Sequence, residues 1–404
     1  MIKFGKWVVK FRIPILILSF LLLIPTGITY MNTRINYDIL SYLPGDIETM
    51  KGQDILLDEF GTGAFSVAVI DGMQEKEITQ LEDKLKEIDH VKDVLWYGAL
   101  ADISIPMDML PDDLRDSLQN ADTGSQLMII TFDTSMSADE TLDAIEEIRD
   151  LTDEQCLLSG MSAVVTDIKK ICNSEVIMYV VIAAGLSALV LALTMDSFLL
   201  PFIFLLSIGM AIVYNLGTNF IAGEISFVTQ ALAAVLQLAV TMDYSIFLWH
   251  SYLENQERYP DDRKRAMSHA ISQTLTSVVG SSITTIAGFL AMCFMTFTLG
   301  MDLGIVMAKG VVFGVIGCVT ILPAMILAMD KWIEKTRHKA IIPDLGRIGG
   351  FVTKHYWIFI ILFLVIIGPA FYGQNHNQVY YDLMGTLPDN LESVKAGNAL
   401  ENDF

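Results

Sequence analysis

The chain has few residues of the kinds that build disulfide frameworks, metal centres or catalytic sites. Its 404 residues include four cysteines and six histidines, and charged residues make up 18% of them. The cysteines show no C-x-x-C spacing and the histidines form no cluster, so we expect neither a disulfide scaffold nor a metal site. The sequence also shows no nucleophile–base pair and no glycine-rich phosphate loop. We therefore predict that the protein is not an enzyme and needs no cofactor.

Apolar residues are what the chain has in excess. They make up 53% of it, and the mean hydropathy is +0.49. Seven runs come close to the length of about 18–20 apolar residues that crosses a bilayer. These runs are roughly 13–31, 175–195, 198–216, 225–250, 277–298, 303–329 and 356–372. The first is too long for a secretory signal peptide and no small-residue cleavage site follows it. We predict an α-helical polytopic membrane bundle.

Lysine and arginine gather in three segments that seven spans would place on one side of the membrane. These segments are 3–12 before the first span, 251–276 between the fourth and fifth, and 330–355 between the sixth and seventh. Because basic loops stay in the cytoplasm, we predict a cytoplasmic N-terminus in the cell (plasma) membrane. Segment 34–170, with 30 Asp or Glu against 10 Lys or Arg, then lies outside. Its acidity is typical of a solvated surface and gives no indication of nucleic acid as a partner.

Residues 32–174 have the composition of a soluble domain between the first two spans. Four β-rich runs alternate with three helical patterns along this segment. The runs lie at 65–70, 91–97, 126–132 and 155–159, and the helical patterns at 74–88, 108–118 and 137–150. This order is close to that of a split βαβ unit. We therefore predict an extracytoplasmic α+β domain of ferredoxin-like, porter type.

A short internal repeat links the end of the chain to its beginning. NYDILSYL at 36–43, followed by Pro44, is matched by VYYDLMGTL at 379–387, followed by Pro388, at an offset of 344 residues. In both copies a basic stretch comes first, an apolar span follows it, and the repeated motif comes after the span. Duplicated halves that start on the same side of the membrane are typical of transporters. The pattern predicts that the chain is the front portion of a longer, duplicated transporter, with the second half as its missing partner.

These boundaries divide the chain into six segments. They are the cytoplasmic N-terminus with the first span (1–31), the porter-like domain (32–174), the bundle of spans two to six (175–330), a cytoplasmic basic linker (331–355), the seventh span (356–372) and the start of a second extracytoplasmic domain (373–404).

Asp243 is the most informative residue, because the apolar stretch 225–250 is otherwise free of charge until its end. An ionised carboxylate near the middle of a bilayer costs roughly 2.5–3.5 kcal/mol, so such a residue is a candidate for binding and releasing an ion. Gln230, Gln237 and Tyr244 are spaced seven apart and share one helix face beside it. This polar stripe is expected to face the bundle interior. Alternatively, the two glutamines only hydrogen-bond neighbouring helices.

Three stretches carry a family resemblance: TMDYSIFLWHSYLE (241–254), SVVGSSITTIAGFLAMCF (277–294) and GIVMAKGVVFGVIGCVTILPAMI (304–326). They resemble spans four to six of RND superfamily transporters of the MMPL branch, the first through its G-x-x-x-D-Y signature. Ala239 stands where that signature has glycine, and it keeps a small side chain. The resemblance implies a proton-motive-force-driven exporter of hydrophobic or lipid-like molecules. Its implied partners are that substrate, membrane lipids and a second half with its own Asp-Tyr pair.

The resemblance also assigns roles to the pair in span four. It implies that Asp243 carries the proton and that Tyr244 hydrogen-bonds its carboxylate. Lys309, the other intramembrane charge, is expected to extend towards the outer interface, where Asp302 is placed to receive it, and not to pair with Asp243. Two alternatives stay open: a half-size RND accessory subunit of protein export, and a non-transporting sterol- or lipid-sensing membrane protein. A homo-oligomer also stays open.

Overall fold

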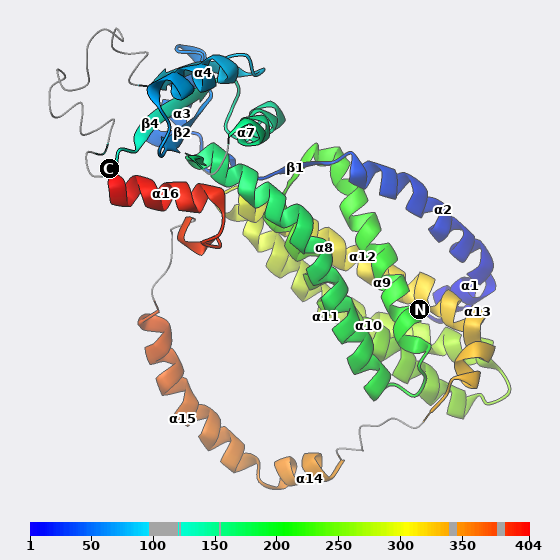
Figure 1. The fold of residues 1–404 in the computed structure, drawn as a ribbon. Coiled ribbons are helices and arrows are strands. Elements are labelled where there is room, and N and C mark those ends of the chain that lie inside the picture. The colour runs from blue at the N-terminus through cyan, green and yellow to red at the C-terminus, as the bar shows by residue number, and fades with distance from the viewer. Residues whose placement is uncertain (97–119, 121–122, 153–154, 339–345, 378–383) are drawn as a thin grey trace.

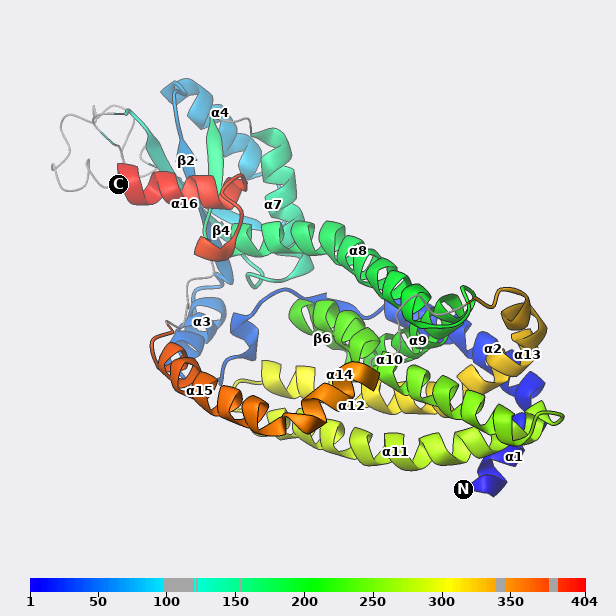
Figure 2. The same cartoon turned by 90° about the horizontal axis from the view of Figure 1, so that it is seen from below.

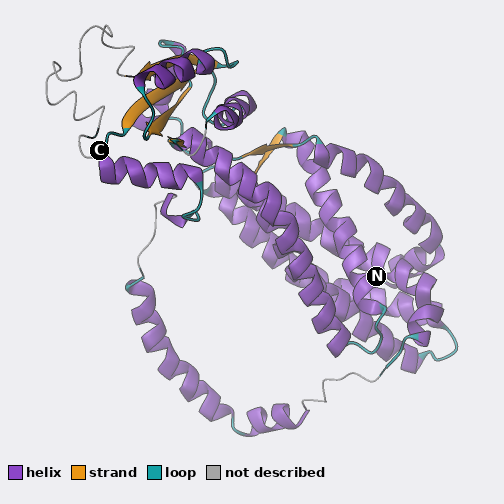
Figure 3. Ribbon diagram, viewed as in Figure 1, coloured by secondary structure: helices purple, strands orange, loops and turns teal. Residues whose placement is uncertain are grey.

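Among the residues that the structure describes, seven helices are long and apolar enough to cross a membrane, which confirms the predicted membrane bundle. The structure is a computed structural model that describes all residues except 97–119, 121–122, 153–154, 339–345 and 378–383. A long helical bundle and a small unit with a sheet lie at opposite ends of the molecule (Figures 1 and 3).

Five spans and a broken sixth form the bundle. The helices are α2 (Arg12–Met31), α8 (Met161–Thr194), α9 (Leu200–Gly217), α10 (Phe227–Arg258), α11 (Arg263–Ala291) and α12 (Leu299–Ile316). The last continues through a π-helical turn (Gly317–Ile321) into α13 (Leu322–Lys335). Pro323 explains this turn, because proline donates no backbone hydrogen bond and its ring crowds the preceding turn. The bundle core is richest in residues of α9, α11 and α13.

Residues 3–12, 251–276 and 330–338 lie at one end of the bundle, as the sequence predicts. The short helix α1 (Ile2–Lys10) packs against α11 there. Arg263 at the start of α11 pairs with Asp330 of α13. Arg337 after α13 pairs with Asp196, in the turn between α8 and α9, at 2.9 Å. These ion pairs join the loops of four spans and close this end of the bundle.

The sheet at the other end has the strand order of a ferredoxin-like unit. Its elements are β2 (Ala64–Ile70), α4 (Glu75–Leu85), β3 (Val91–Trp96), β4 (Gln126–Phe132), α7 (Asp139–Leu151) and β5 (Cys156–Ser159). The order β3-β4-β2-β5, with every neighbouring pair antiparallel, is that of two interleaved βαβ halves. Ile78 of α4 and Ile145 of α7 are buried against Ile130 of β4. The helix expected at 108–118 lies outside the described residues.

Helix α8 connects this unit to the membrane without a break. Its 34 residues are ~51 Å long at ~1.5 Å per residue, well beyond the ~30 Å hydrocarbon core. Ala163 in its first turn is buried in the core of the sheet unit, and Val164 is buried in a cluster with Leu142 of α7. The border expected at 174/175 falls inside this helix, because α8 continues without a break from the polar stretch 167–175 into the apolar span.

The internal repeat extends over four helices at the offset of 344 residues. Helices α1, α2 and η1 (Leu40–Tyr42) recur as α14 (Gly346–Lys354), α15 (Tyr356–Asn375) and η6 (Met384–Thr386) with the same bounds. Helix α3 (Glu48–Asp58) recurs as α16 (Glu392–Asp403) with the same start. Pro25 inside α2 even matches Pro369 inside α15.

The repeated elements are packed differently. Helix α15 has no buried residue and lies apart from the other spans (Figure 1), although it overlaps α11 when seen from below (Figure 2). Helix α16, in contrast, packs on β5 and buries Val394 and Ala396. Its Glu392 pairs with Arg149 of α7 at 3.1 Å. A helix of the second repeat thus covers the sheet of the first.

Candidate functional site

Asp243 lies on the exposed face of α10, in an otherwise apolar row. Leu232, Leu236, Ala239, Asp243 and Phe247 are spaced by three or four residues, so they share one side of the helix. All five are exposed, and Phe247 is 58% exposed. In a bilayer this side meets lipid or another protein segment, and neither favours an ionised carboxylate without a partner.

Tyr244 lies in the bundle core and not beside the Asp243 carboxylate. Its ring is only 6% exposed, and its carbonyl accepts a hydrogen bond from Cys318 Sγ at 3.2 Å. Consecutive residues of a helix are separated by about 100°, which sends the two side chains to different faces. In the described part of the chain no hydrogen bond joins the two residues, and the Asp243 carboxylate has no polar partner. The contact expected from the family resemblance is therefore not formed in this conformation.

The two glutamines of the predicted polar stripe hydrogen-bond neighbouring helices. Gln237 is 1% exposed, and its Oε1 accepts a hydrogen bond from Asn215 Nδ2 of α9 at 3.0 Å. Gln230 Nε2 donates to the Tyr30 hydroxyl of α2 at 3.0 Å. The stripe of Gln230, Gln237 and Tyr244 faces the bundle interior as expected, whereas Asp243 lies on a different face of α10. Helix-to-helix bonding thus accounts for both glutamines.

Lys309 extends outward along α12, as predicted, but it reaches a different partner. Its ammonium donates to Asn219 Oδ1 at the outer end of α9. Asp302 Oδ2 instead accepts a hydrogen bond from the Ser226 backbone at 3.0 Å, which fixes the start of α10. The described residues show no hydrogen bond between Lys309 and Asp302, which the sequence offered as a possible partner.

Asn215 and Asn219 are polar residues of the interior that the sequence analysis missed. Each is at least 96% buried, since their exposed fractions are 0% and 4%. Asn215 Oδ1, Asn219 Nδ2 and Gln237 Nε2 have no protein partner within the described residues. Two asparagines at the end of an apolar run are a weak signal in sequence, but they form a polar cluster here with Lys309.

Two glycines of α12 allow this cluster to form. A Cβ at Gly310 would lie 2.7 Å from Asn215 Nδ2 and 2.9 Å from Gln237 Oε1. A Cβ at Gly314 would lie 2.0 Å from Thr241 Cγ2 of α10. Helix α12 can therefore approach α10 closely only because glycine, which has no side chain, occupies both positions.

Asp38, from the Tyr37-Asp38 pair that recurs in the internal repeat, has a structural role outside the spans. Asp38 is 5% exposed, and its Oδ1 accepts the Leu40 amide hydrogen at 2.8 Å. Burial raises the pKa of this carboxyl group. The side chain thus fixes the turn between the first span and the outer unit.

An apolar cavity of about 520 Å³ lies between α3, the start of β2 and the start of α8. Its lining includes Leu40, Ile55, Leu56, Phe65, Met136 and Met161. Methionine and aliphatic side chains adapt to apolar ligands of varied shape. The cavity is large enough for part of a lipid-like molecule.

Seven membrane-crossing helices with a ferredoxin-like unit define a multi-pass membrane protein. The chain belongs to the MMPL family, whose model matches residues 59–355. It is 24% identical over 366 residues to the "Probable transport protein MmpL12" of Mycobacterium tuberculosis, covering 87% of this chain and 30% of that protein. The family expected from the span-four motif is thereby confirmed, and the chain spans less than a third of the length of that relative.

A shorter relative and a solved structure give further matches. The "Putative membrane protein MJ1562" of Methanocaldococcus jannaschii is 23% identical over 365 residues, which cover 79% of this chain and 92% of that protein. The crystal structure of SecDF in its super-membrane-facing form matches with a TM-score of 0.43 and 13% identity. That match covers 81% of this chain and 39% of SecDF.

Proposed function

We propose that the protein is a proton-motive-force-driven exporter of hydrophobic or lipid-like molecules, in which Asp243 binds and releases the proton. The observation that carries this proposal is the position of Asp243 on an exposed apolar helix face, without a polar partner in the described residues. An ionised carboxylate is costly in apolar surroundings, which suits a group that binds and releases a proton during transport.

The same face is suited to a second half of the transporter. Ala239 lies one turn from Asp243 on the exposed row of α10, and a small residue lets another helix approach closely. Helix α15 is exposed along its whole length, although it repeats α2, which packs on α9. We propose that a second repeat covers both surfaces and supplies the group that Asp243 meets when it is ionised.

The apolar cavity under α3 supports a hydrophobic cargo. It lies in the outer unit, and we propose that the cargo leaves the membrane through it. A pocket lined by methionine and aliphatic side chains selects apolar molecules by burial and not by hydrogen bonds.

Transport by the full-length protein in vesicles tests the proposal. A pH gradient, acidic on the side of the sheet unit, should drive a lipophilic fluorescent substrate out of the vesicles and carry protons inward. Collapse of the gradient by an ionophore should stop both fluxes. Substrate movement that is unaffected by the ionophore would contradict proton coupling.

A bulky residue in the cavity should block export. Gly52 lines the cavity from α3, and a Cβ there meets nothing within 4 Å, so a side chain can start from this position without a backbone clash, as in Gly52→Trp. We expect the rate of substrate efflux to fall at least about tenfold, since an indole fills much of the ligand space. Gly45→Trp is the matched control, because Gly45 is equally open but does not line the cavity. Equal efflux by both variants would exclude the cavity from the cargo path.

Assembly from half-size chains is a second candidate. The 92% coverage of MJ1562 shows that a relative of about this extent exists, which favours a transporter assembled from two such chains. The mass of the purified complex distinguishes the two arrangements. A complex of two copies with a single Asp-Tyr motif each would support assembly from halves.

A further inference from the structure

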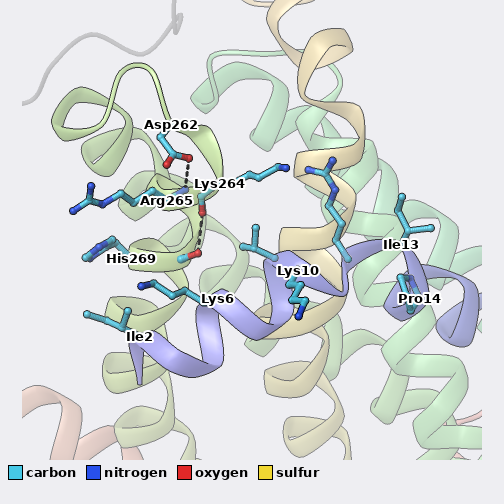
Figure 4. A pocket seen from close by; sticks show the side chains of 12 residues that line it. Ile2, Lys6, Lys10, Ile13, Pro14, Asp262, Lys264, Arg265 and His269 are labelled. Atoms are coloured by element: carbon cyan, nitrogen blue, oxygen red, sulfur yellow. Dashed lines mark hydrogen bonds between the residues drawn. The ribbon is translucent and has the colours of Figure 1, made fainter.

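A basic cavity lies at the end of the bundle where the three basic segments meet. Its volume is about 880 Å³, and it lies between α1, the start of α2 and the start of α11. The cationic and imidazole side chains that line it are Lys6, Lys10, Arg12, Lys264, Arg265 and His269. Figure 4 shows α1 crossing α11, with Lys6 and His269 pointing to the same side of the crossing.

The positive charge of this cavity is not balanced by the protein. In the part of the chain that the structure describes, none of the five lysines and arginines of the cavity forms an ion pair. Asp262 is the one carboxylate of the lining, and its Oδ1 accepts the Arg265 amide hydrogen at 2.9 Å as the cap of α11. Arg263 and Arg337 at the same end are neutralised by acidic partners. Several unpaired cations around one hollow favour an anion.

The walls of the cavity are held in place. A Cβ at Gly5 would lie 2.3 Å from the Ser268 carbonyl oxygen, so α1 lies directly on the α11 backbone. The Arg265 guanidinium lies 4.5 Å from the centre of the Tyr259 ring, and the His269 ring lies 5.1 Å from the same ring. These contacts orient the Arg265 guanidinium and the His269 imidazole before a ligand arrives.

The cavity also has an apolar side that continues into the membrane. Ile13 and Pro14, in the first turn of the span α2, line it together with Ile2 of α1. Ile13 is 59% exposed, and Ile17 one turn further along the span is 64% exposed. A ligand that satisfies both sides has an anionic head and an apolar chain that follows α2.

We propose that this cavity binds the phosphate of an anionic phospholipid, with an acyl chain lying along the start of α2. Basic pockets between spans at the membrane surface suit such headgroups, since each Lys or Arg there attracts anionic lipid. The exposed apolar row of α2 favours a lipid over a free phosphate or a nucleotide. This site is separate from Asp243 and from the outer cavity, and it does not depend on the proposed transport.

Lipid binding to the purified full-length protein tests the site. Native mass spectrometry in detergent would compare phosphatidylglycerol with phosphatidylcholine of the same acyl chains, each with and without excess inorganic phosphate. We expect the Kd for phosphatidylglycerol to be at least about tenfold lower than that for phosphatidylcholine. We expect inorganic phosphate to leave that difference in place. Equal Kd values for the two lipids, or loss of the preference in phosphate, would overturn the proposal.

Charge-matched variants locate the binding. The triple change Lys6→Gln, Lys10→Gln and Arg265→Gln should raise the phosphatidylglycerol Kd about tenfold. The control Lys331→Gln, Lys335→Gln and Lys354→Gln removes the same charge from exposed positions outside the cavity and should leave Kd within about twofold. If the first triple variant misfolds, the double change at Lys6 and Lys10 spares the Tyr259 contact and should still weaken binding. Equal loss in test and control variants would show general electrostatic attraction and overturn the site.

Discussion

Efflux by the full-length protein is expected to fall to the background of protein-free vesicles when Asp243 is replaced by asparagine. Asparagine has the same shape but cannot release a proton, so coupling to the pH gradient is lost. The fold should persist, since the carboxylate is exposed on α10 and has no polar partner within the described residues. Efflux of a lipophilic substrate under an imposed pH gradient, with the melting temperature measured in parallel, checks both expectations.

Two variants complete this prediction. Asp243→Glu retains an ionisable group and should restore part of the efflux. Asp261→Asn removes an exposed carboxylate from the turn between α10 and α11 and should leave efflux unchanged. Full efflux by Asp243→Asn would make the carboxylate structural, and a lipid-sensing function without proton coupling would become the better account.

Gly217→Ala should destabilise the bundle by about 1–3 kcal/mol, since overpacking of a close helix contact costs this much. A Cβ at Gly217 would lie 2.1 Å from the Thr26 carbonyl oxygen of α2, where neither backbone can move aside easily. The change would also disturb the hydrogen bond that Thr29 Oγ1 donates to the Gly217 carbonyl at 2.7 Å. The expected result is a melting temperature lowered by several degrees in detergent.

Gly209→Ala is the matched control in the same helix. A Cβ at Gly209 meets nothing within 4 Å, so the substitution adds helix propensity without a clash. Its melting temperature should be unchanged or slightly raised. If both alanine variants melt alike, the packing of α2 on α9 at Gly217 does not hold the bundle together.

The spans and the sheet order could be predicted because each depends on a local pattern. A bilayer requires a run of apolar residues that is visible in the sequence, as in 303–329, and strands alternate with helices along the outer segment. The length of α8 is harder to predict, because its polar stretch 167–175 and its apolar span form one continuous helix across the border expected at 174/175. The packing of α16 on β5 depends on residues more than 200 positions apart and has no local signal.

The site was only partly predictable for a related reason. The single carboxylate of an apolar run identifies Asp243 without knowledge of its neighbours. Whether the Tyr244 hydroxyl reaches that carboxylate depends on which faces of α10 other helices cover. The cluster of Asn215 and Asn219 with Lys309 requires that α9 and α12 be adjacent, and composition alone does not show this.

The most direct test of the central claim is the reaction of Asp243 with a hydrophobic carbodiimide, which modifies protonated carboxyl groups in apolar surroundings. Mass spectrometry of the full-length protein would measure the modified fraction over a range of pH, with Asp261 as an internal control. We predict that Asp243 is modified, that its modified fraction falls as the pH rises, and that efflux is lost in proportion to modification. An unmodified Asp243 at every pH, or full efflux from the modified protein, would contradict a proton-carrying role.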